Sequence, residues 1–220
     1  MLFAAGFGTR MAPLTDGRPK PLIKVARRAL LDHALAQASG VTRRVINTHY
    51  FPEQIERHIA GQDIVTVHEP DLLETGGGLR NALPALGHGP VFTLNTDAVW
   101  TGPSACDQLR AAWDPAHMDA LLLLVPKNRA LGHVGQGDFT KDSAGRLTRG
   151  AGDIYTGAQI IRPDLLHDIP AQKFSLNLLW ERLLERGRLF GILHAGHWCD
   201  VGRPQSIALA EQMLKDHSNV

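Results

Sequence analysis

The feature that most constrains this chain is a glycine-containing loop directly after the first apolar segment. Residues 2–5 have the composition of a short buried strand, and Gly6 and Gly8 follow at once. Glycines at such a turn let backbone N–H groups approach a polyanion, because no Cβ stands in the way. Arg10 and Lys20 add two nearby cations, which suit a triphosphate better than a dinucleotide. The alternative interpretation is a tight strand-to-helix turn flanked by surface cations.

Short apolar segments alternate with longer amphipathic segments over the first 126 residues. The expected strands are 2–5, 44–47, 64–68, 91–95 and 120–125, and the expected helices are 30–38, 52–59, 78–86 and 104–113. Alternating strands and helices predict βαβ units and a parallel sheet. We therefore predict an α/β fold with a Rossmann-like, mostly parallel sheet flanked by helices.

The pattern changes after residue 126. Residues 132–152 are rich in glycine and contain two short strand-like segments, 137–141 and 146–149, which indicates a hairpin-bearing insertion. Expected strands at 154–161 and 189–194 and expected helices at 176–186 and 204–214 follow. We expect a single domain over residues 1–220. Its core spans 1–126, and a small β-rich sub-lobe with the closing elements spans 127–220, next to the sheet edge where ligands bind in such folds.

Composition and charge exclude several classes of protein. Lys and Arg total 23 against 22 Asp and Glu, a net charge of +1, so no nucleic-acid partner is expected. The apolar run at 120–125 is far shorter than the ~20 residues of a membrane helix, and the first residues do not resemble a secretion signal. Two cysteines do not make a disulfide framework. We expect a soluble cytoplasmic protein without membrane contact.

Several motifs together resemble the signature of sugar-1-phosphate nucleotidyltransferases. Gly-Phe-Gly-Thr-Arg-Met-Ala-Pro-Leu-Thr at 6–15 and Arg-Pro-Lys-Pro-Leu at 18–22 match its first part. Leu-Glu-Thr-Gly-Gly-Gly at 73–78, Asn-Thr-Asp at 95–97 and Trp-Cys-Asp-Val-Gly at 198–202 follow in the family's order. The chain departs from the family pattern at Thr96, where Gly is usual, and at Lys24, where Pro is common. The Glu-Thr-Gly-Gly-Gly segment is most similar to N-acetylmuramate-1-phosphate uridylyltransferases of bacterial cell-wall recycling.

The resemblance implies an enzyme that transfers a nucleoside monophosphate from a triphosphate to a sugar 1-phosphate and releases pyrophosphate. Such a reaction depends on positioning and charge neutralisation. Arg10 would hold the β- and γ-phosphates, and Lys20 would lie between the two reacting phosphates. Asp97 and Asp200, each expected at a strand end, would bind Mg²⁺.

The same resemblance implies two further groups of contacts. The nucleotide would be bound by Ala4, Ala5, Gly6, Gly8, Thr9, Glu69, Glu74, Gly76 and Asn95. The sugar would be bound by Gly137, Asp138, Thr156, Gly157 and Asn177. For Asn177, an ordinary helix position is the alternative.

Glu69 bears on the choice of base, since alignment with the family places it at the nucleobase. An ionised carboxylate only accepts hydrogen bonds, so it requires a base with a ring N–H. Uracil and thymine offer N3–H and guanine offers N1–H, whereas adenine and cytosine have an unprotonated ring nitrogen there. We predict UTP as the favoured substrate, with dTTP and GTP as alternatives. The competing interpretation is that Glu69 is a solvated residue at a strand end.

Several alternative functions are considered from single features of the sequence. Within the family, the alternatives are a mannose-1-phosphate guanylyltransferase and a glucose-1-phosphate uridylyl- or thymidylyltransferase. A non-catalytic nucleotide-sugar-binding subunit would be expected to lack Arg10, Lys20 or a metal-binding Asp, and all are present. A nicotinamide-dependent oxidoreductase needs a third loop glycine, where this chain has Met11. No histidine pair has zinc-ligand spacing. The chain is too short for an added β-helix domain, so we expect a monomer.

Overall fold

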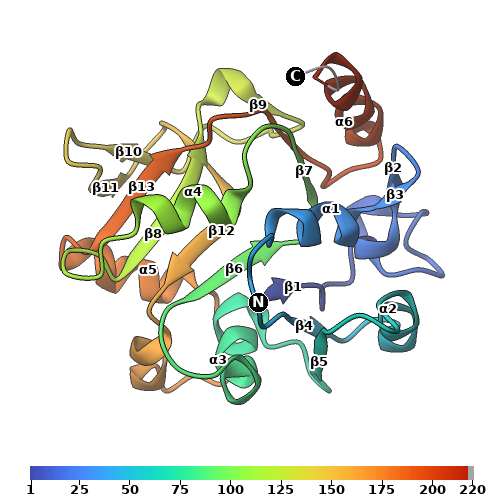
Figure 1. Cartoon of the computed structure of the whole chain (residues 1–220), viewed down its shortest axis with the longest axis horizontal. Helices are drawn as coiled ribbons and strands as arrows, with labels where there is room; N and C mark the ends of the chain where they lie inside the picture. The colour runs from blue at the N-terminus through green and yellow to red at the C-terminus, as the bar shows by residue number, and fades with distance from the viewer. Residues whose placement is uncertain (218–220) are drawn as a thin grey trace.

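The computed structural model describes residues 1–217, and its centre is a seven-stranded sheet (Figure 1). The strand order is β13-β8-β12-β6-β1-β4-β5. These strands are β1 (Leu2–Phe3), β4 (Val45–Thr48), β5 (Val65–His68), β6 (Val91–Asn95), β8 (Ala120–Val125), β12 (Ile154–Ile161) and β13 (Leu189–Leu193). All neighbouring pairs are parallel except those of β12. The α/β fold with a mostly parallel sheet, expected from the sequence, is confirmed.

Strand β12 runs antiparallel to both of its neighbours, β6 and β8. Its register against β8 shifts between Tyr155 and Gln159, which marks a bulge. Gly157 lies within this bulge at φ +86°, a left-handed conformation that glycine adopts without a Cβ clash. A Cβ at this position would also come within 2.7 Å of the Asn95 Cβ. The bulge therefore brings β12 close to the end of β6.

Helices cover both faces of the sheet (Figure 1). One apolar cluster joins α1 (Leu30–Gln37), α2 (Pro52–His58) and α4 (Ala105–Ala112) to one face. A second cluster joins α3 (Glu74–Leu86) and α5 (Asn177–Glu185) to the other face. The last helix, α6 (Gln205–Asp216), packs in a third cluster outside the central sheet. At the start of α4, the Ser104 Oγ accepts a hydrogen bond from the Asp107 N–H and caps the helix.

Three small sheets surround the central one. The hairpin expected within 137–149 is present as β10 (Phe139–Lys141) and β11 (Leu147–Arg149). The sequence did not predict the hairpin of β2 (Lys24–Val25) and β3 (Arg28–Ala29), nor the sheet β7-β14-β9. The strands of that sheet are β7 (Ala98–Trp100), β9 (Ala130–Leu131) and β14 (Trp198–Asp200). Short 3-10 helices are η1 (Thr9–Met11), η2 (Lys20–Leu22), η3 (Lys127–Arg129) and η4 (Pro163–Asp168).

Helix α3 begins four residues earlier than the sequence indicated. The predicted start was residue 78, whereas the helix starts at Glu74 and includes Gly76, Gly77 and Gly78. Glycine has low helix propensity, which argued against a helix there. All three glycines are buried, so packing against neighbouring segments offsets that penalty. The prediction was wrong because it weighed only local preference.

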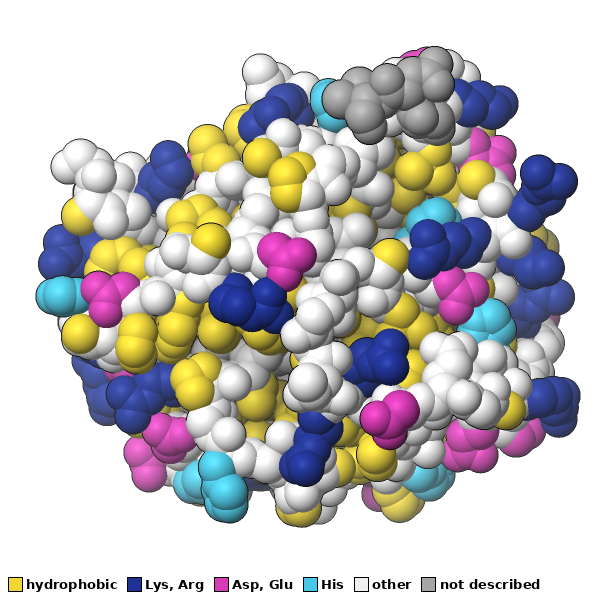
Figure 2. Space-filling view, in the orientation of Figure 1, with side chains coloured by type: hydrophobic (Ala, Val, Ile, Leu, Met, Phe, Trp, Pro, Cys, Tyr) yellow, Lys and Arg dark blue, Asp and Glu magenta, His cyan; other side chains and the backbone are white. Residues whose placement is uncertain are grey.

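The surface matches the balanced composition. Figure 2 shows basic and acidic side chains interspersed with apolar ones on the face of the molecule that is drawn. No helix within residues 1–217 has the length and apolar character needed to cross a bilayer.

Candidate active site

Three adjoining cavities open along one edge of the central sheet. The first has a volume of about 310 Å³ and is lined by the glycine loop, Asn47, Glu69, the start of α3 and residues 95–97. The second extends toward Asp200, and the third extends toward Arg149. Asn95, the last residue of β6, lines all three. The three cavities therefore meet at the end of β6.

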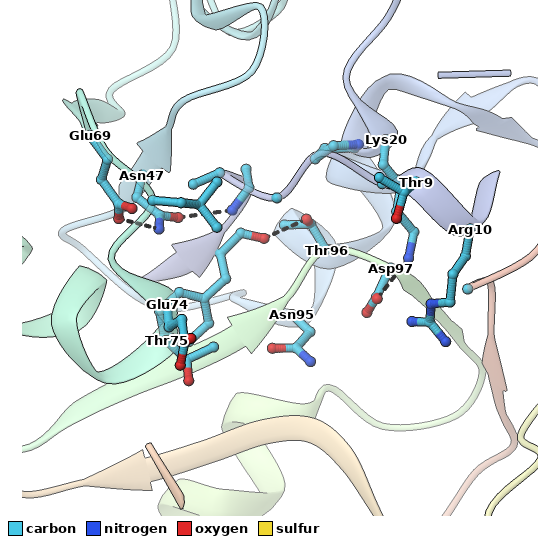
Figure 3. A pocket seen from close by; sticks show the side chains of 18 residues that line it. Thr9, Arg10, Lys20, Asn47, Glu69, Glu74, Thr75, Asn95, Thr96 and Asp97 are labelled. Carbon is cyan, nitrogen blue, oxygen red and sulfur yellow. Dashed lines mark hydrogen bonds and ion pairs between the residues drawn. The ribbon is translucent and has the colours of Figure 1, made fainter. Parts of the chain in front are cut away.

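A buried chain of hydrogen bonds forms one end of the first cavity (Figure 3). The Ala4 N–H donates to Asn47 Oδ1 at 2.8 Å, and Asn47 Nδ2 donates to Glu69 Oε1 at 2.7 Å. The Leu73 N–H donates to Glu69 Oε2 at 3.0 Å. Glu69 is only 1% exposed, so the interpretation of a solvated strand-end residue is wrong. In both of these bonds the Glu69 side chain is the acceptor, as expected for a carboxylate.

The glycines of α3 allow the helix to pack directly against the side chains of Asn47 and Glu69. A Cβ at Gly78 would lie 2.6 Å from Glu69 Oε1 and 3.0 Å from Asn47 Nδ2. Gly76 packs against the Phe174 ring, and its N–H donates to the Phe174 carbonyl at 2.9 Å. Glu74, which precedes them, adopts a left-handed conformation at φ +61° and lines the cavity. The absence of side chains at these positions sets the distance between α3 and the end of β4.

Cations gather at the opposite end of the first cavity (Figure 3). Gly8 has φ +65°, and a Cβ there would lie 2.7 Å from the Lys20 Cβ, so the loop packs directly on η2. Lys20 Nζ donates to Asp97 Oδ2 at 2.8 Å, and its side chain is 11% exposed. Arg10 lines both the first and the second cavity. The two predicted cations thus share this end of the site.

The two predicted metal-binding carboxylates are brought together by the small sheet β7-β14-β9. Asp200 pairs with Ala98, and the Val201 N–H donates to the Asp97 carbonyl at 2.8 Å. Burial raises the pKa of Asp200, and the negative charge of Asp97 raises it further. Lys20, Arg10 and His133 oppose this rise. Two like charges held close together in a partly buried position suit a bound cation.

The donor set fits Mg²⁺ better than a transition metal. Among residues 1–217, no group of three or more His, Cys, Asp and Glu side chains is arranged to hold a metal. Mg²⁺ commonly takes one or two carboxylates from a protein and completes its shell with water and phosphate oxygens. Asp97 and Asp200 could supply that share.

The two departures from the family pattern have different surroundings. Thr96 is buried, and its Oγ1 donates to the Phe3 carbonyl at 2.6 Å, which ties the end of β6 to β1. Lys24 is an exposed residue of β2 and lines none of the three cavities.

Most of the predicted site residues lie on these cavities. The first is lined by Ala4, Ala5, Gly6, Gly8, Thr9, Arg10, Lys20, Glu69, Glu74, Asn95 and Asp97. The second is lined by Asp200, Thr156 and Gly157, and the third by Asp138 and Asn177. Gly76 and Gly137 line none of the three, and a Cβ at Gly137 would overlap the Gly152 backbone. Gly137 is thus placed in close backbone packing.

Several polar residues of the site were not predicted from the sequence. Asn47 and Thr75 line the first cavity, His133 and Arg203 the second, and Arg149 the third. Asn47 stands in a buried strand, where a polar side chain is itself a signal, because such a group needs a partner. Thr75 lies at the start of α3 within the motif at 73–78, whereas His133, Arg149 and Arg203 lie on loops or at a strand end without a local pattern.

Comparisons with known proteins agree on one family. The model described as "MobA-like NTP transferase domain" matches residues 1–216. An N-acetylmuramate alpha-1-phosphate uridylyltransferase of Caulobacter vibrioides is 40% identical, covering 98% of this chain and 96% of its own. One of Neisseria meningitidis serogroup B is 35% identical, covering 92% of each. A crystal structure of a putative glucose-1-phosphate thymidylyltransferase from Bacillus anthracis matches the fold, with a TM-score of 0.81 at 15% identity over 98% of this chain and 94% of its own.

Proposed function

The chain belongs to the family of MobA-like NTP transferase domains, and from that premise we propose that it is an N-acetylmuramate-1-phosphate uridylyltransferase. A phosphate oxygen of the sugar 1-phosphate attacks the α-phosphorus of UTP. The bond between that phosphorus and the bridging oxygen breaks, and pyrophosphate leaves. The products are UDP-N-acetylmuramate and pyrophosphate.

The observation that carries this proposal is the polarity of the first cavity. A buried acceptor, Glu69, lies at one end, and the cations Arg10 and Lys20 lie at the other. A nucleoside triphosphate has the matching polarity, with hydrogen-bond donors on its base and negative charge on its phosphates. The cavity is therefore suited to hold the base at Glu69 and the phosphates at the glycine loop.

Selection of uracil follows from the bonds that Glu69 already makes. Each carboxylate oxygen accepts one hydrogen bond from the protein, from Asn47 or from Leu73. A carboxylate has about four acceptor positions, so it retains capacity for the N3–H of uracil. The unprotonated ring nitrogen of cytosine or adenine would leave two acceptors facing each other at a cost of about 1–3 kcal/mol. The names of the relatives favour UTP over dTTP and GTP.

Charge neutralisation at the other end supports the chemical step. Arg10 holds the β- and γ-phosphates of the leaving pyrophosphate, and Lys20 stabilises the negative charge that gathers between the reacting phosphates. Asp97 and Asp200 would hold Mg²⁺, which would lower the repulsion between the phosphate groups. The sugar phosphate attacks as an anion, so the step needs no general base from the protein.

The acceptor sugar occupies the second and third cavities in this proposal. Thr156 and Gly157 form one wall, and Asp138 and Asn177 present groups for hydroxyls on the other. We also propose that the enzyme is cytoplasmic, since its two cysteines are buried and unpaired, and that it acts as a monomer.

A pyrophosphate-release screen tests the proposal. The four ribonucleoside triphosphates and dTTP are each paired with the 1-phosphates of N-acetylmuramate, N-acetylglucosamine, glucose and mannose, with and without Mg²⁺. We expect the highest kcat/KM for UTP with N-acetylmuramate 1-phosphate, and Mg²⁺-dependent release. A preference for GTP with mannose 1-phosphate would assign the chain to the guanylyltransferases. Binding of nucleotide sugar without turnover would assign it to non-catalytic subunits.

A further inference from the structure

The third cavity contains an arginine to which none of the steps above assigns a role. Arg149 ends strand β11 and lines this cavity together with Asn95, Asp138 and Asn177. Because Asn95 also lines the cavities assigned to the nucleotide and the metal, the third cavity adjoins the reacting centre. A sugar substituent that points away from the phosphate has room to enter it.

Two aromatic rings and the side chains of Glu181 and Asn177 hold the Arg149 guanidinium in place. Its Cζ lies 4.6 Å from the centre of the Phe139 ring and 5.6 Å from that of Trp180. Nε and Nη2 donate to Glu181 Oε1 at 2.9 and 2.8 Å, and Nη2 also donates to Asn177 Oδ1 at 2.8 Å. Stacking and hydrogen bonding together hold the plane of the group in a single orientation.

These contacts leave one edge of the guanidinium available. Within residues 1–217, Nη1 has no protein acceptor, whereas Nε and Nη2 are both engaged. An arginine held on one side, with free N–H groups on the other, is suited to bind a planar anion. The side chain is 37% exposed, so a ligand in the cavity can reach it.

We propose that Arg149 is a specificity-determining residue that binds the carboxylate of an acidic sugar. This inference rests on the proposed function. N-acetylmuramate is N-acetylglucosamine with a lactyl ether at O3, and the lactyl group ends in a carboxylate. The free edge of Arg149 binds that carboxylate, so the enzyme distinguishes N-acetylmuramate 1-phosphate from N-acetylglucosamine 1-phosphate at this position.

The two acidic residues near Arg149, Glu181 and Asp138, have different roles. Glu181 lies on the opposite edge from the free Nη1 and keeps the guanidinium in place. Asp138 also lines the cavity, and its Oδ2 accepts the Tyr155 N–H at 2.8 Å. Asp138 accepts a hydrogen bond from a sugar hydroxyl, and its negative charge makes the cation at Arg149 necessary for an anionic substituent to bind.

The test compares two substrates in the wild type and three variants. Wild type, Arg149→Met and Arg149→Lys are assayed with UTP against the 1-phosphates of N-acetylmuramate and N-acetylglucosamine. The matched control is Arg146→Met, since Arg146 lies on the same strand-and-turn segment, stacks on Phe190 and pairs with Asp142, and lines none of the three cavities. The readout is the ratio of kcat/KM for the two sugars, together with the melting temperature of each variant.

We expect Arg149→Met to lower that ratio by at least about tenfold, with little change in kcat/KM for N-acetylglucosamine 1-phosphate. Arg149→Lys keeps the charge but loses the bonds to Glu181 and Asn177 that orient the guanidinium, so its ratio should be intermediate, and Arg146→Met should match wild type. A wild-type ratio in Arg149→Met and Arg149→Lys would overturn the inference and leave the proposed function standing. Failure of the wild type to use N-acetylmuramate 1-phosphate would overturn both. If Arg149→Met does not fold, Arg149→Lys alone decides.

Discussion

The two ends of the first cavity differ in how their polar and charged side chains are balanced by other groups of the protein. At the base end, Asn47 and Glu69 are buried and hydrogen-bonded to each other and to backbone N–H groups. At the phosphate end, Asp97 pairs with Lys20, and burial and a neighbouring charge raise the pKa of Asp200. The polar groups at the base end are hydrogen-bonded to one another before a ligand binds, whereas the phosphate end concentrates charged groups, among which Asp200 is disfavoured by burial and by Asp97.

This difference implies that the two ends contribute differently to stability and to activity. Polar groups at the base end belong to the folded core, so changing them leaves buried partners unsatisfied. At the phosphate end, Asp200 is held against the cost of its burial and the repulsion of Asp97, so neutralising it costs little folding energy. Substitutions at the phosphate end should lower turnover at constant stability, and substitutions at the base end should lower both stability and selectivity.

The largest effect on turnover is expected for Asp200→Asn. Loss of one metal-binding carboxylate should reduce kcat by at least about 10³-fold. The melting temperature should stay equal or rise, because the variant removes a charge that burial and Asp97 disfavour. Pyrophosphate release and thermal unfolding, each with and without MgCl₂, measure this. Wild type should gain thermal stability from MgCl₂ with nucleotide, and Asp200→Asn should not; near-wild-type turnover would remove Asp200 from the metal site.

Lys20→Ala should lower kcat by about 10²–10³-fold. The fall in kcat should exceed the rise in KM for UTP, because the charge of Lys20 matters most in the transition state. Steady-state kinetics over a range of UTP concentrations separates the two parameters. A change confined to KM would limit Lys20 to ground-state binding.

Gly6→Ala sharpens the comparison at the phosphate end. A Cβ at Gly6 meets no protein atom within 4 Å, so the melting temperature should be unchanged. The methyl group lies on the surface of the nucleotide cavity, and we expect kcat/KM for UTP to fall about 10- to 100-fold. Wild-type kinetics in a normally folded variant would show that the loop backbone does not contact the phosphates.

At the base end, Glu69→Ala should change selectivity and stability together. The variant leaves Asn47 Nδ2 and the Leu73 N–H without their acceptor, at a cost of about 2 kcal/mol or more, or roughly 5 °C in melting temperature. The preference for UTP over CTP and ATP should fall about tenfold. Measuring kcat/KM for each triphosphate checks this, and an unchanged preference would place base selection elsewhere.

The smallest effect on turnover is expected for Gly78→Ala, which changes stability more than rate. Its Cβ would displace Glu69 Oε1 and Asn47 Nδ2, at a cost of about 1–3 kcal/mol. Selectivity for UTP should fall only a few-fold, because the carboxylate is shifted and not removed. Gly6→Ala is the matched control, since it adds the same methyl group at the other end of the same cavity. Equal melting temperatures for the two variants would contradict the proposed difference between the ends.

Local pattern was sufficient for strands with a continuous apolar sequence. Strands β6 and β8 are continuous apolar segments, and their predicted bounds of 91–95 and 120–125 agree with the structure. The sheet β7-β14-β9 was missed because its strands have two or three residues and pair over long sequence separations. Neither length nor alternation marks such strands.

Most site residues that belong to a sequence motif were predicted. Asn47 and Arg149, which belong to no motif, were missed. Gly6, Gly8 and Lys20 stand in a motif whose spacing indicates phosphate binding, and all three line the first cavity. Asn47 and Arg149 belong to no motif, because their importance depends on partners distant in sequence. Their roles follow only from the folded structure, as tertiary packing decides which polar groups meet.

The small sheet that holds Asp200 also has a consequence for how the protein is made. Strands β6, β1, β4 and β5 are neighbours in the central sheet, and all lie within the first 95 residues. The glycine loop, Glu69 and Asp97 belong to the same early part of the chain, whereas Asp200 follows Asp97 by nearly half its length. Since a ribosome releases the N-terminal part first, this half of the sheet can assemble while Asp200 is still to be synthesised. A nascent chain can therefore acquire every residue that lines the first cavity, except Gly202, before Asp200 is synthesised.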